Sequence, residues 1–258
     1  MTMCSTASLP PCGFAPLLFN LERFVRLSED DKSAIAGLRR APLVEVRARG
    51  DLVREGQNPS VVRLMVSGWA SRYKDLPDGR RQVVGFFIPG DFCDLNVFIL
   101  QAMDHSIGAL TAVEYLAVPP ELLDRITSDR PRVAQALLWQ ELVVTATSRE
   151  WLLNIGQRNA LERLAHLFVE IFMRMRAIDQ THDHSCDFPL TQNDLAEALG
   201  LTPVHINRTI QEMRREGLIE LAQKRLTIFD YDRLKRIAMF NANYLHLEHE
   251  GHYLDAND

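Results

Sequence analysis

Short apolar runs, separated by turn residues, recur between residues 42 and 118 of this 258-residue chain. Strands of this length joined by tight turns are typical of antiparallel sheets. Proline and glycine stand at the ends of the runs, where they leave the hydrogen-bond ladder intact. The segment therefore predicts a β-sandwich or a rolled antiparallel barrel. The runs include VVRLMVSG, QVVGFFI and ALTAVEYLAV, and turn signals stand at 55–56, 67–68, 77–79 and 89–90.

Helical spacing replaces the strand pattern on both sides of this segment. Apolar residues recur at helical intervals within residues 20–40, and Ser28 precedes three acidic residues in the manner of a helix cap. A long helix is predicted to begin near Ser128, with Pro131 in its first turn, where proline is tolerated. A second helix, 158–178, follows it and has one broad apolar face.

Four apolar residues of the long helix have nearly heptad spacing. Val133, Leu137, Val144 and Trp151 follow one another at intervals of 4, 7 and 7 residues. Such a stripe predicts a coiled-coil seam between two copies of the chain. The alternative is that the same stripe packs on the β segment of its own chain.

Three segments lack this periodicity. Residues 1–19 are small and proline-containing and predict a flexible tail. The stretch THDHSCDFP is short and polar, ends in proline and predicts a linker. We therefore divide the chain into a tail (1–19), a β-rich domain (20–127), a long helix with its connector (128–180), a C-terminal unit (181–245) and a second flexible tail (246–258).

The stretch PLTQNDLAEALGLTPVHINRTIQEMRREGLI, residues 189–219, predicts two helices joined by a tight turn. Thr191 begins a capping-box pattern for the first helix. Gly200 can end that helix, because glycine adopts the left-handed conformation at no steric cost. Thr202 and Pro203 are natural N-cap and first residues for the second helix.

The second of these helices has an apolar and a polar face. Ile206, Ile210 and Met213 are expected to face the core, which leaves a donor-rich face outward. The following stretch, LIELAQKRLTIFD, alternates like a hairpin with Lys224 and Arg225 near its tip. This combination is typical of a winged helix-turn-helix that binds a DNA major groove. The alternative is an ordinary helix pair with a solvated charged face.

The net charge of the chain, -5, has the wrong sign for DNA. Phosphate contacts, however, need a local basic face and not a basic protein. The acidic residues cluster elsewhere, as in LSEDD. The residues expected to make the local basic face are Arg208, Arg214, Arg215, Lys224 and Arg225.

Composition places the chain among soluble proteins. The hydrophobic share is 47% and the charged share 24%, which are ordinary values for a globular protein. No apolar run approaches the about 18 residues that a membrane span needs, and the N-terminus lacks the basic start of a secretory signal. We expect a cytoplasmic protein without a membrane partner.

No catalytic or metal-binding pattern stands out. The histidines of HLEHEGH near the C-terminus and of THDHSC have metal-like spacing, but both segments lack a packed apolar surrounding, so no metal site is expected. No phosphate-loop, nucleophile-elbow or zinc-protease motif is present, and we do not expect an enzyme. The four cysteines, expected to be structural, are Cys4, Cys12, Cys93 and Cys186.

The order of these parts resembles the Crp/Fnr family of bacterial transcription regulators. The most specific pieces are TQNDLAEALGLTPVHINRTIQEMRREGLI and the IPGDF that ends the β region. The resemblance implies an α+β fold, with a cyclic-nucleotide-binding-like β-roll as sensor, a long dimerisation helix and a C-terminal winged helix-turn-helix. It also implies a homodimer whose recognition helices, 203–216, contact a pseudo-palindromic operator in double-stranded DNA. RNA polymerase is a further candidate partner.

The stretch GDFCDLNVFILQAMDHSIGAL, residues 90–110, corresponds to the phosphate-binding cassette of cAMP-binding members. Asp94 stands near their Glu and His105 near their Arg, so the phosphate-neutralising arginine is missing. A neutral histidine is a poor phosphate partner, and cAMP binding is therefore not expected. The candidate residues for any effector pocket are Gly90, Asp91, Asp94, His105 and Ser106.

An iron–sulfur cluster is not expected either. Oxygen-sensing members of the family carry an N-terminal cysteine cluster, whereas only Cys4 and Cys12 lie in this tail, fewer than the four ligands that a cluster typically needs. Cys93 is interpreted as a packing residue rather than a redox thiol.

The recognition helix differs from the familiar family pattern at two base-reading positions. Val204 stands where those members have a Glu, and Pro203 where some have an Arg. Arg208 matches the family's base-contacting arginine, which suits a guanine edge. The predicted DNA contacts are Thr191, Gln192, Thr202, Pro203, Val204, His205, Asn207, Arg208, Gln211, Arg214, Lys224 and Arg225.

Two functions are compatible with these observations. The first is a dimeric DNA-binding transcription regulator, with or without an effector. The second is a ligand- or metal-binding signalling protein whose winged helix makes protein contacts. Salt-dependent affinity for DNA distinguishes them, because only the first releases counterions from phosphate.

Overall fold

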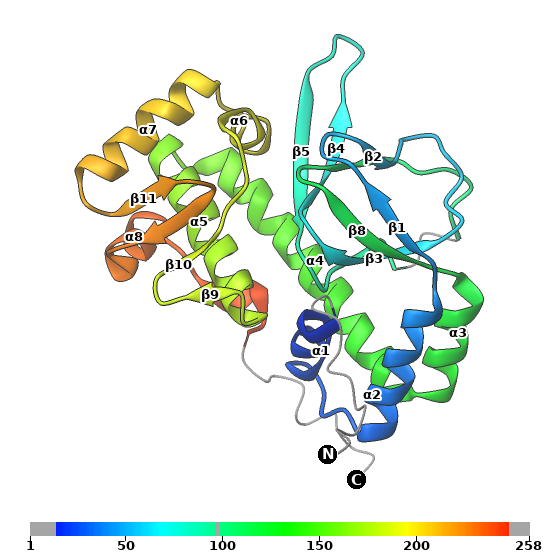
Figure 1. The fold of residues 1–258 in the computed structure, drawn as a ribbon. Helices are drawn as coiled ribbons and strands as arrows, with labels where there is room; N and C mark the ends of the chain where they lie inside the picture. The colour runs from blue at the N-terminus through cyan, green and yellow to red at the C-terminus, as the bar shows by residue number, and fades with distance from the viewer. Residues whose placement is uncertain (1–13, 96–98, 248–258) are drawn as a thin grey trace, which may run out of the picture.

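A long helix, α4 (Pro131–Gln157), runs between two parts of the molecule in the computed structural model, which describes residues 14–95 and 99–247 (Figure 1). A β-roll formed by the N-terminal half lies on one side of α4. A C-terminal unit of helices and short strands lies on the other side (Figure 1). This arrangement confirms the predicted α+β fold class.

The β-roll consists of two four-stranded antiparallel sheets. Their strand orders are β1-β8-β3-β6 and β2-β7-β4-β5, so each sheet contains strands from both ends of the segment. Buried apolar side chains such as Leu64, Ile107 and Val118 form the core of this part. The strands are β1 (Leu43–Val46), β2 (Asp51–Val53), β3 (Val62–Ser67), β4 (Ala70–Asp75), β5 (Arg81–Phe87), β6 (Phe92–Cys93), β7 (Ser106–Ala109) and β8 (Val113–Val118).

Helices close one end of the β-roll (Figure 1). The predicted tail 1–19 was wrong for its last six residues, because α1 (Phe14–Glu22) begins there and buries Phe14 and Leu17 in the core. Ser28 caps the next helix through the predicted pattern, with a reciprocal bond to Asp31. The remaining helices at this end are α2 (Glu29–Ala36), η1 (Gly37–Arg40) and α3 (Pro120–Asp129).

The turn that contains Gly90 lies directly against α1. Gly90 has φ +89°, a conformation that side chains rarely adopt, and an added Cβ would come within 2.7 Å of the Leu17 nitrogen and of the Pro16 carbonyl carbon. The absence of a side chain at this position therefore allows the N-terminal helix to dock.

The long helix begins three residues later than predicted. Ser128 belongs to the separate helix α3, and α4 starts at Pro131, whose missing N–H and fixed φ suit a first helical residue. The sequence pattern does not separate these two helices, because only Arg130 lies between them.

The predicted dimer seam does not lie on the surface. Val133 and Leu137 pack in the core of the β-roll and Trp151 in the core of the C-terminal unit, while Val144 is half-buried. The same-chain alternative, packing on the β segment, therefore describes Val133 and Leu137 fully and Trp151 in part, because the Trp151 ring also lies against Phe86 of β5. The exposed large apolar residues of α4 lie on a neighbouring face and are Leu138, Leu142, Leu152 and Leu153.

The C-terminal unit begins earlier than residue 181. Helix α5 (Ala160–Ala177), which the sequence pattern places in the connector, packs in the same core as the helices that follow it. Its N-terminus is capped by Asn159. The other helices of the unit are α6 (Gln192–Leu199), α7 (Pro203–Arg215), α8 (Tyr231–Ile237) and η3 (Ala242–Leu245).

The predicted linker is part of a sheet. It forms β9 (Thr181–His182) and β10 (Ser185–Asp187), and β10 pairs with β12 (Arg225–Ile228), which in turn pairs with β11 (Ile219–Ala222). The prediction of a linker was wrong because Cys186 and Phe188 are buried in the core. Their burial stabilises the strand although the neighbouring residues are polar.

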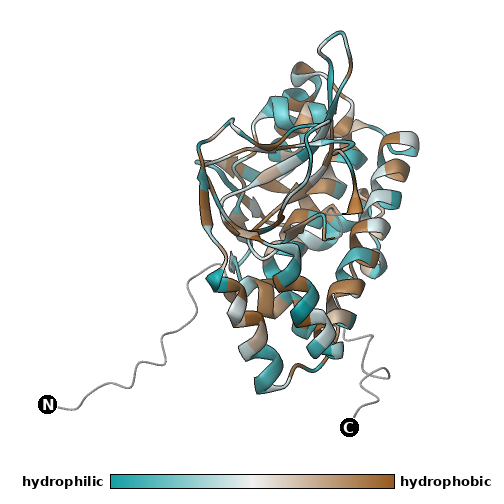
Figure 2. Cartoon of the chain, turned by 90° about the vertical axis from the view of Figure 1, so that its right-hand side faces the viewer, coloured by the Kyte–Doolittle hydropathy of each residue, from teal (hydrophilic) through white to brown (hydrophobic). Residues whose placement is uncertain are grey.

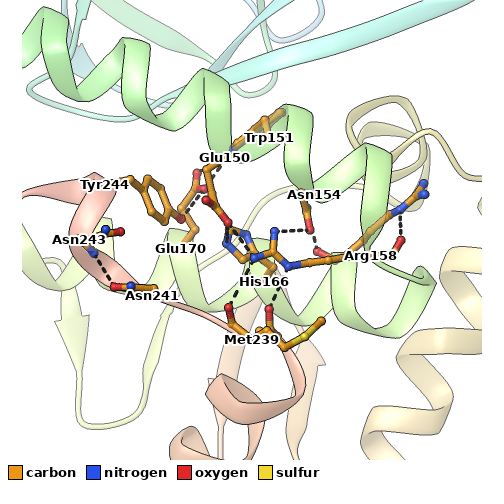
Figure 3. Close-up of polar contacts among 12 residues, drawn as sticks. Glu150, Trp151, Asn154, Arg158, His166, Glu170, Met239, Asn241, Asn243 and Tyr244 are labelled. Atoms are coloured by element: carbon orange, nitrogen blue, oxygen red, sulfur yellow. Dashed lines mark hydrogen bonds and ion pairs between the residues drawn. The ribbon is translucent and has the colours of Figure 1, made fainter.

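A buried carboxylate joins α4, α5 and the C-terminal segment (Figure 3). Glu170 of α5 is fully buried and accepts hydrogen bonds from the Trp151 indole N–H at 3.1 Å and from the Tyr244 hydroxyl at 2.9 Å. Burial raises the pKa of the Glu170 carboxyl, because desolvation of the charged form outweighs the opposing charge of Arg174. These two donors therefore fix the C-terminal segment on the long helix.

A second buried contact at the same junction involves Arg158 (Figure 3). Its guanidinium donates to Glu150 at 2.7 Å and to the Ala238 carbonyl at 3.1 Å. His166 lies against the Phe240 ring, and burial together with the charge of Arg158 lowers the pKa of His166 to about 3. The histidine is therefore neutral at physiological pH, and its Nε2 lies 3.1 Å from the Glu150 carboxylate.

The helices carry both hydrophilic and hydrophobic residues along their length (Figure 2). Within residues 14–95 and 99–247, no helix combines the length and the apolar character that a membrane crossing requires.

Replacement of Gly90 by alanine is expected to lower the free energy of unfolding by about 3 kcal/mol or more, because strain at positive φ adds to the overlap with α1. Urea denaturation measures the change. Gly79→Ala is the matched control: Gly79 has φ +87° with nothing within 4 Å of an added Cβ, so only strain of about 1–2 kcal/mol is expected. Equal losses in the two variants would contradict the proposed packing of α1 on this turn.

Candidate nucleic-acid interface and sensor region

Helices α6 and α7 are connected by the tight turn that the sequence predicted. Thr191 and Asp194 form the predicted capping box, and Gly200 ends α6 with φ +63°. Thr202 caps α7 by accepting from the His205 N–H at 3.2 Å, and Pro203 is the first helical residue. These local contacts fix the direction in which α7 leaves the turn.

The two faces of α7 have the predicted character. Ile206, Ile210 and Met213 are buried in the core of the C-terminal unit. The helix lies on the outer side of the unit, away from the β-roll (Figure 1). Its exposed residues are Pro203, Val204, His205, Asn207, Arg208, Gln211, Arg214 and Arg215, and Thr191, Gln192 and Thr202 of the preceding helix and turn are exposed as well.

The hairpin β11–β12 forms the wing beside α7. Lys224 is exposed at its tip, where it has φ +59°. Arg225 is less available, because its guanidinium bonds Asp187 and the Ser185 hydroxyl. Arg214 donates to the Leu221 carbonyl and thereby ties α7 to the wing. Among the described residues, Arg208, Arg215 and Lys224 make no ion pair, so these cations are left for an external anion.

The β-roll contacts α6, the first helix of the helix-turn-helix. Arg49 donates to both oxygens of Asp194, at 2.6 and 3.1 Å, and the Gln82 side chain donates to the Ala198 carbonyl at 3.1 Å. Helix α6 accordingly lies beside β5 (Figure 1). Burial disfavours the charged carboxylate of Asp194, but its hydrogen bonds with Arg49 and Thr191 outweigh that and lower its pKa. Asp194 thus serves both the cap of α6 and the junction with the sensor.

Two of the predicted effector-pocket residues meet in the structure. The His105 ring nitrogen Nε2 lies 2.9 Å from the Asp94 carboxylate, and Nδ1 lies 2.7 Å from Asp104. Arg72 of β4 donates to the other oxygen of Asp94. The Asp94 carboxylate therefore neutralises the two basic side chains beside it, those of Arg72 and His105.

These neighbours shift both proton equilibria. Burial favours the neutral form of each group, but the hydrogen bond and charge of Asp94 outweigh it and raise the pKa of His105. In the same way, the bonds to His105 and Arg72 outweigh burial and lower the pKa of Asp94. A charged pair, Asp94 with His105, is therefore favoured in the folded protein.

The other three predicted effector residues serve the packing of the fold. Gly90 contacts α1, and the Ser106 hydroxyl accepts from the Glu55 N–H at 2.9 Å. Asp91 accepts from the Ile88 N–H and from Arg174 of α5, both at 2.8 Å. The five residues consequently do not line one common pocket.

Comparison with known proteins gives two family matches. The sequence model of the Crp-like helix-turn-helix domain matches residues 162–237, and that of the cyclic nucleotide-binding domain matches residues 43–130. The nitrogen fixation regulation protein FixK of Rhizobium meliloti is 30% identical over 182 residues, which cover 70% of this chain and 76% of that protein. The chain belongs to the Crp/Fnr family of transcription regulators. It is thus a DNA-binding transcription regulator.

Other relatives extend this Crp/Fnr assignment over nearly the whole length. The transcriptional activatory protein AadR of Rhodopseudomonas palustris is 28% identical over 244 residues, which cover 92% of each chain. In solved structures, FixK2 of Bradyrhizobium japonicum has a TM-score of 0.70 at 22% identity and covers 78% of this chain and 99% of its own. A CooA mutant of Carboxydothermus hydrogenoformans has a TM-score of 0.64 at 16% identity, with coverage of 86% and 95%. Both structures show the shared fold.

Sequence reasoning missed three residues at this Crp/Fnr sensor. Arg72 bonds Asp94, and Arg49 joins the sensor to α6. Glu141 of α4 is held near Asp94, and burial raises the pKa of its carboxyl. Arg72 lies in the polar strand ASRYKD, whose composition gave no sign of the bond to Asp94. The partner of Arg49, Asp194, is 145 residues away along the chain and left no local signal.

The remaining cysteines and histidines form no metal site among the described residues. Cys93 and Cys186 are buried free thiols, and burial raises the pKa of Cys186 to about 12. His182 and His184 are exposed. Cys4, Cys12 and most of HLEHEGH lie outside the described residues.

The stability contributed by His105 should depend on pH. Because its folded pKa is raised, the contribution is fully present below the unfolded value of about 6.5 and is lost as pH rises through the folded pKa. The difference in unfolding free energy between the unsubstituted chain and His105→Gln should therefore be larger at pH 5.5 than at pH 8.5, as measured by urea denaturation. His184→Gln, at an exposed position, is the control. A pH-independent difference would contradict the charged pair with Asp94.

Proposed function

We propose that the chain regulates transcription as a homodimer that reads a pseudo-palindromic operator through α7 and its partner copy. The observation that carries this proposal is the exposed polar face of α7, with Arg208 and Arg215 unpaired among the described residues. That face fits a major groove, and the neighbouring Lys224 is positioned for a phosphate. Arg208 is assigned to a guanine edge, which a guanidinium can bind in a bidentate manner.

The dimer is assigned to the exposed face of α4. Leu138, Leu142 and Leu152 lie on a row at intervals of 4 and 10 residues, and Thr145 and Arg149 fill the heptad positions between them. Intervals of four and three residues are those of a coiled-coil seam. Leu153 stands next to this row and is also exposed. Dimerisation would bury these leucines and place two copies of α7 symmetrically on DNA.

The effector, where one is used, is proposed to differ from a cyclic nucleotide. The cassette lacks the family's arginine, and Asp94 already bonds Arg72 and His105. A cyclic phosphate would have to displace this carboxylate and would meet it as a like charge. The residues that are present thus do not fit the nucleotide.

The direction of regulation is proposed to be activation. AadR is named as a transcriptional activatory protein and is similar to this chain over 92% of both lengths. Activation by a DNA-bound dimer requires contact with the transcription machinery, so RNA polymerase is a proposed partner. The Arg49–Asp194 contact is proposed to restrict the orientation of α7 until the sensor changes state.

Selection of bound sequences from random duplex DNA, with purified chain and no added effector, tests this proposal. A two-fold symmetric motif is expected. Enrichment of an asymmetric single site would contradict the dimer. Absence of enrichment from folded protein, for the unsubstituted chain and for Arg49→Ala alike, would contradict DNA reading by α7, because the variant lacks the contact that is proposed to restrain it.

Substitution of Arg208 by alanine should weaken binding to the selected operator by about 1–3 kcal/mol and relax one base position, because a bidentate base contact is lost. Titration of operator and of random duplex DNA measures both effects. Lys224→Ala is the matched control, since loss of a phosphate contact should weaken both duplexes alike and reduce the salt dependence. Equal losses on both duplexes for Arg208→Ala would contradict its assignment to a base.

A further inference from the structure

Val204 is an apolar side chain on the polar face of α7. Its exposed fraction is 79%, the largest of any exposed large apolar residue in the part of the chain that the structure describes. The buried face of the helix is made by Ile206, Ile210 and Met213, and Val204 lies outside that core, in the first turn after Pro203. Packing within the chain therefore does not account for an apolar residue at this position.

Val204 begins a row of exposed side chains along α7. Asn207, Arg208 and Gln211 stand three, four and seven residues after it, and residues at these intervals share one face of a helix. All three are exposed, and within residues 14–95 and 99–247 their side chains make no hydrogen bond and no ion pair. The amides and the guanidinium of this row are therefore available to an external partner.

The row has the length of a few base pairs. An α-helix rises about 1.5 Å per residue, so about 6 Å along the axis separate Val204 from Arg208, and about 10 Å separate it from Gln211. Successive base pairs of DNA are about 3.4 Å apart. With α7 in a major groove, the row therefore covers about three neighbouring base-pair steps.

The residue types of the row match different base edges. In the major groove only thymine carries a methyl group, which an apolar side chain can contact, whereas an asparagine amide binds N6 and N7 of adenine. Valine has no polar group, so a cytosine amino group or a guanine oxygen placed against Val204 would lose its hydration without a replacement. A β-branched side chain also has one dominant rotamer in a helix, which holds the Val204 methyl groups in place.

We propose that Val204 contacts the methyl group of a thymine and that Asn207 binds an adenine near it. Each half-site of the operator then combines A·T pairs with the guanine assigned to Arg208. This inference rests on the proposed function, because it requires α7 to lie in a major groove. It goes beyond that function by assigning two further side chains to the base edges that select the operator.

Replacement of single thymines by deoxyuridine in the selected operator tests the contact of Val204, since it removes one methyl group and keeps the base pairing. At one thymine of each half-site, the replacement should weaken binding about fourfold, as expected for one methyl group removed from a contact. In Val204→Ala the same replacement should change the Kd by less than about twofold, because the contacting methyl groups are gone. Fluorescence anisotropy titration of labelled duplexes measures each Kd.

Two controls accompany this measurement. Val84→Ala makes the same chemical change at an exposed valine of β5 and should keep the fourfold difference between thymine and deoxyuridine. Because Val204 is exposed, Val204→Ala should also leave the midpoint of urea denaturation unchanged, which separates a lost contact from a lost fold.

Variants of the base and of the side chain test the rest of the assignment. Replacement of one adenine of each half-site by 7-deazaadenine, which lacks the N7 acceptor, should weaken binding about fivefold or more, and Asn207→Ala should remove that difference. Selection from random duplex DNA with Val204→Glu should replace the contacted thymine by cytosine, because a carboxylate accepts from the cytosine amino group.

Several results would overturn the inference. One is a chain that binds its selected operator with equal affinity whichever thymine is replaced. Another is an equal loss on deoxyuridine for the unsubstituted chain and for Val204→Ala, and a third is the same thymine selected by Val204→Glu. Each of these leaves DNA reading by α7 intact, whereas failure to select any operator would contradict the proposed function and this inference with it.

Discussion

The junction of α4, α5 and the C-terminal segment depends on one buried carboxylate. Glu170 has no exposure to solvent and holds Trp151 of α4 and Tyr244 of the C-terminal segment, so three distant parts of the chain meet at a single group. A buried acid is tolerated only when donors replace its lost hydration, and removal of one donor leaves part of the desolvation of that acid uncompensated. Because α5, which carries Glu170, shares its core with α6 and α7, this contact relates the sensor side of α4 to the recognition helix.

The parts of the fold that could be predicted from sequence are those fixed by neighbours in the chain. The caps at Ser28, Thr191 and Thr202 and the left-handed Gly200 involve residues no more than four positions apart, so their patterns are visible in the sequence. The β9 and β10 strands form only because β12 and a buried core receive them. Their own polar composition carries no sign of this tertiary support.

The helix faces of α4 and the sensor residues show a second limit of prediction from the sequence. A row that contains Val133 and Leu137 and a row that contains Leu138 and Leu142 both have apolar residues at helical spacing, and only the packed structure shows which row the core covers. Similarly, the missing arginine of the cassette was visible at His105, but Arg72, on another strand, supplies the cation at Asp94. A family pattern shows which residue stands at each position of the cassette. The charge balance around Asp94, however, depends on side chains from separate segments of the chain.

The Arg49–Asp194 contact has a consequence for how ionic strength affects this regulator. The Arg49 side chain is 56% exposed, so dissolved salt screens its attraction to Asp194. Salt also weakens protein–phosphate contacts by making counterion release less favourable. If α6 must separate from the sensor before α7 binds DNA, added salt promotes the first step while it opposes the second. The measured salt dependence would then underestimate the number of phosphates that the protein touches.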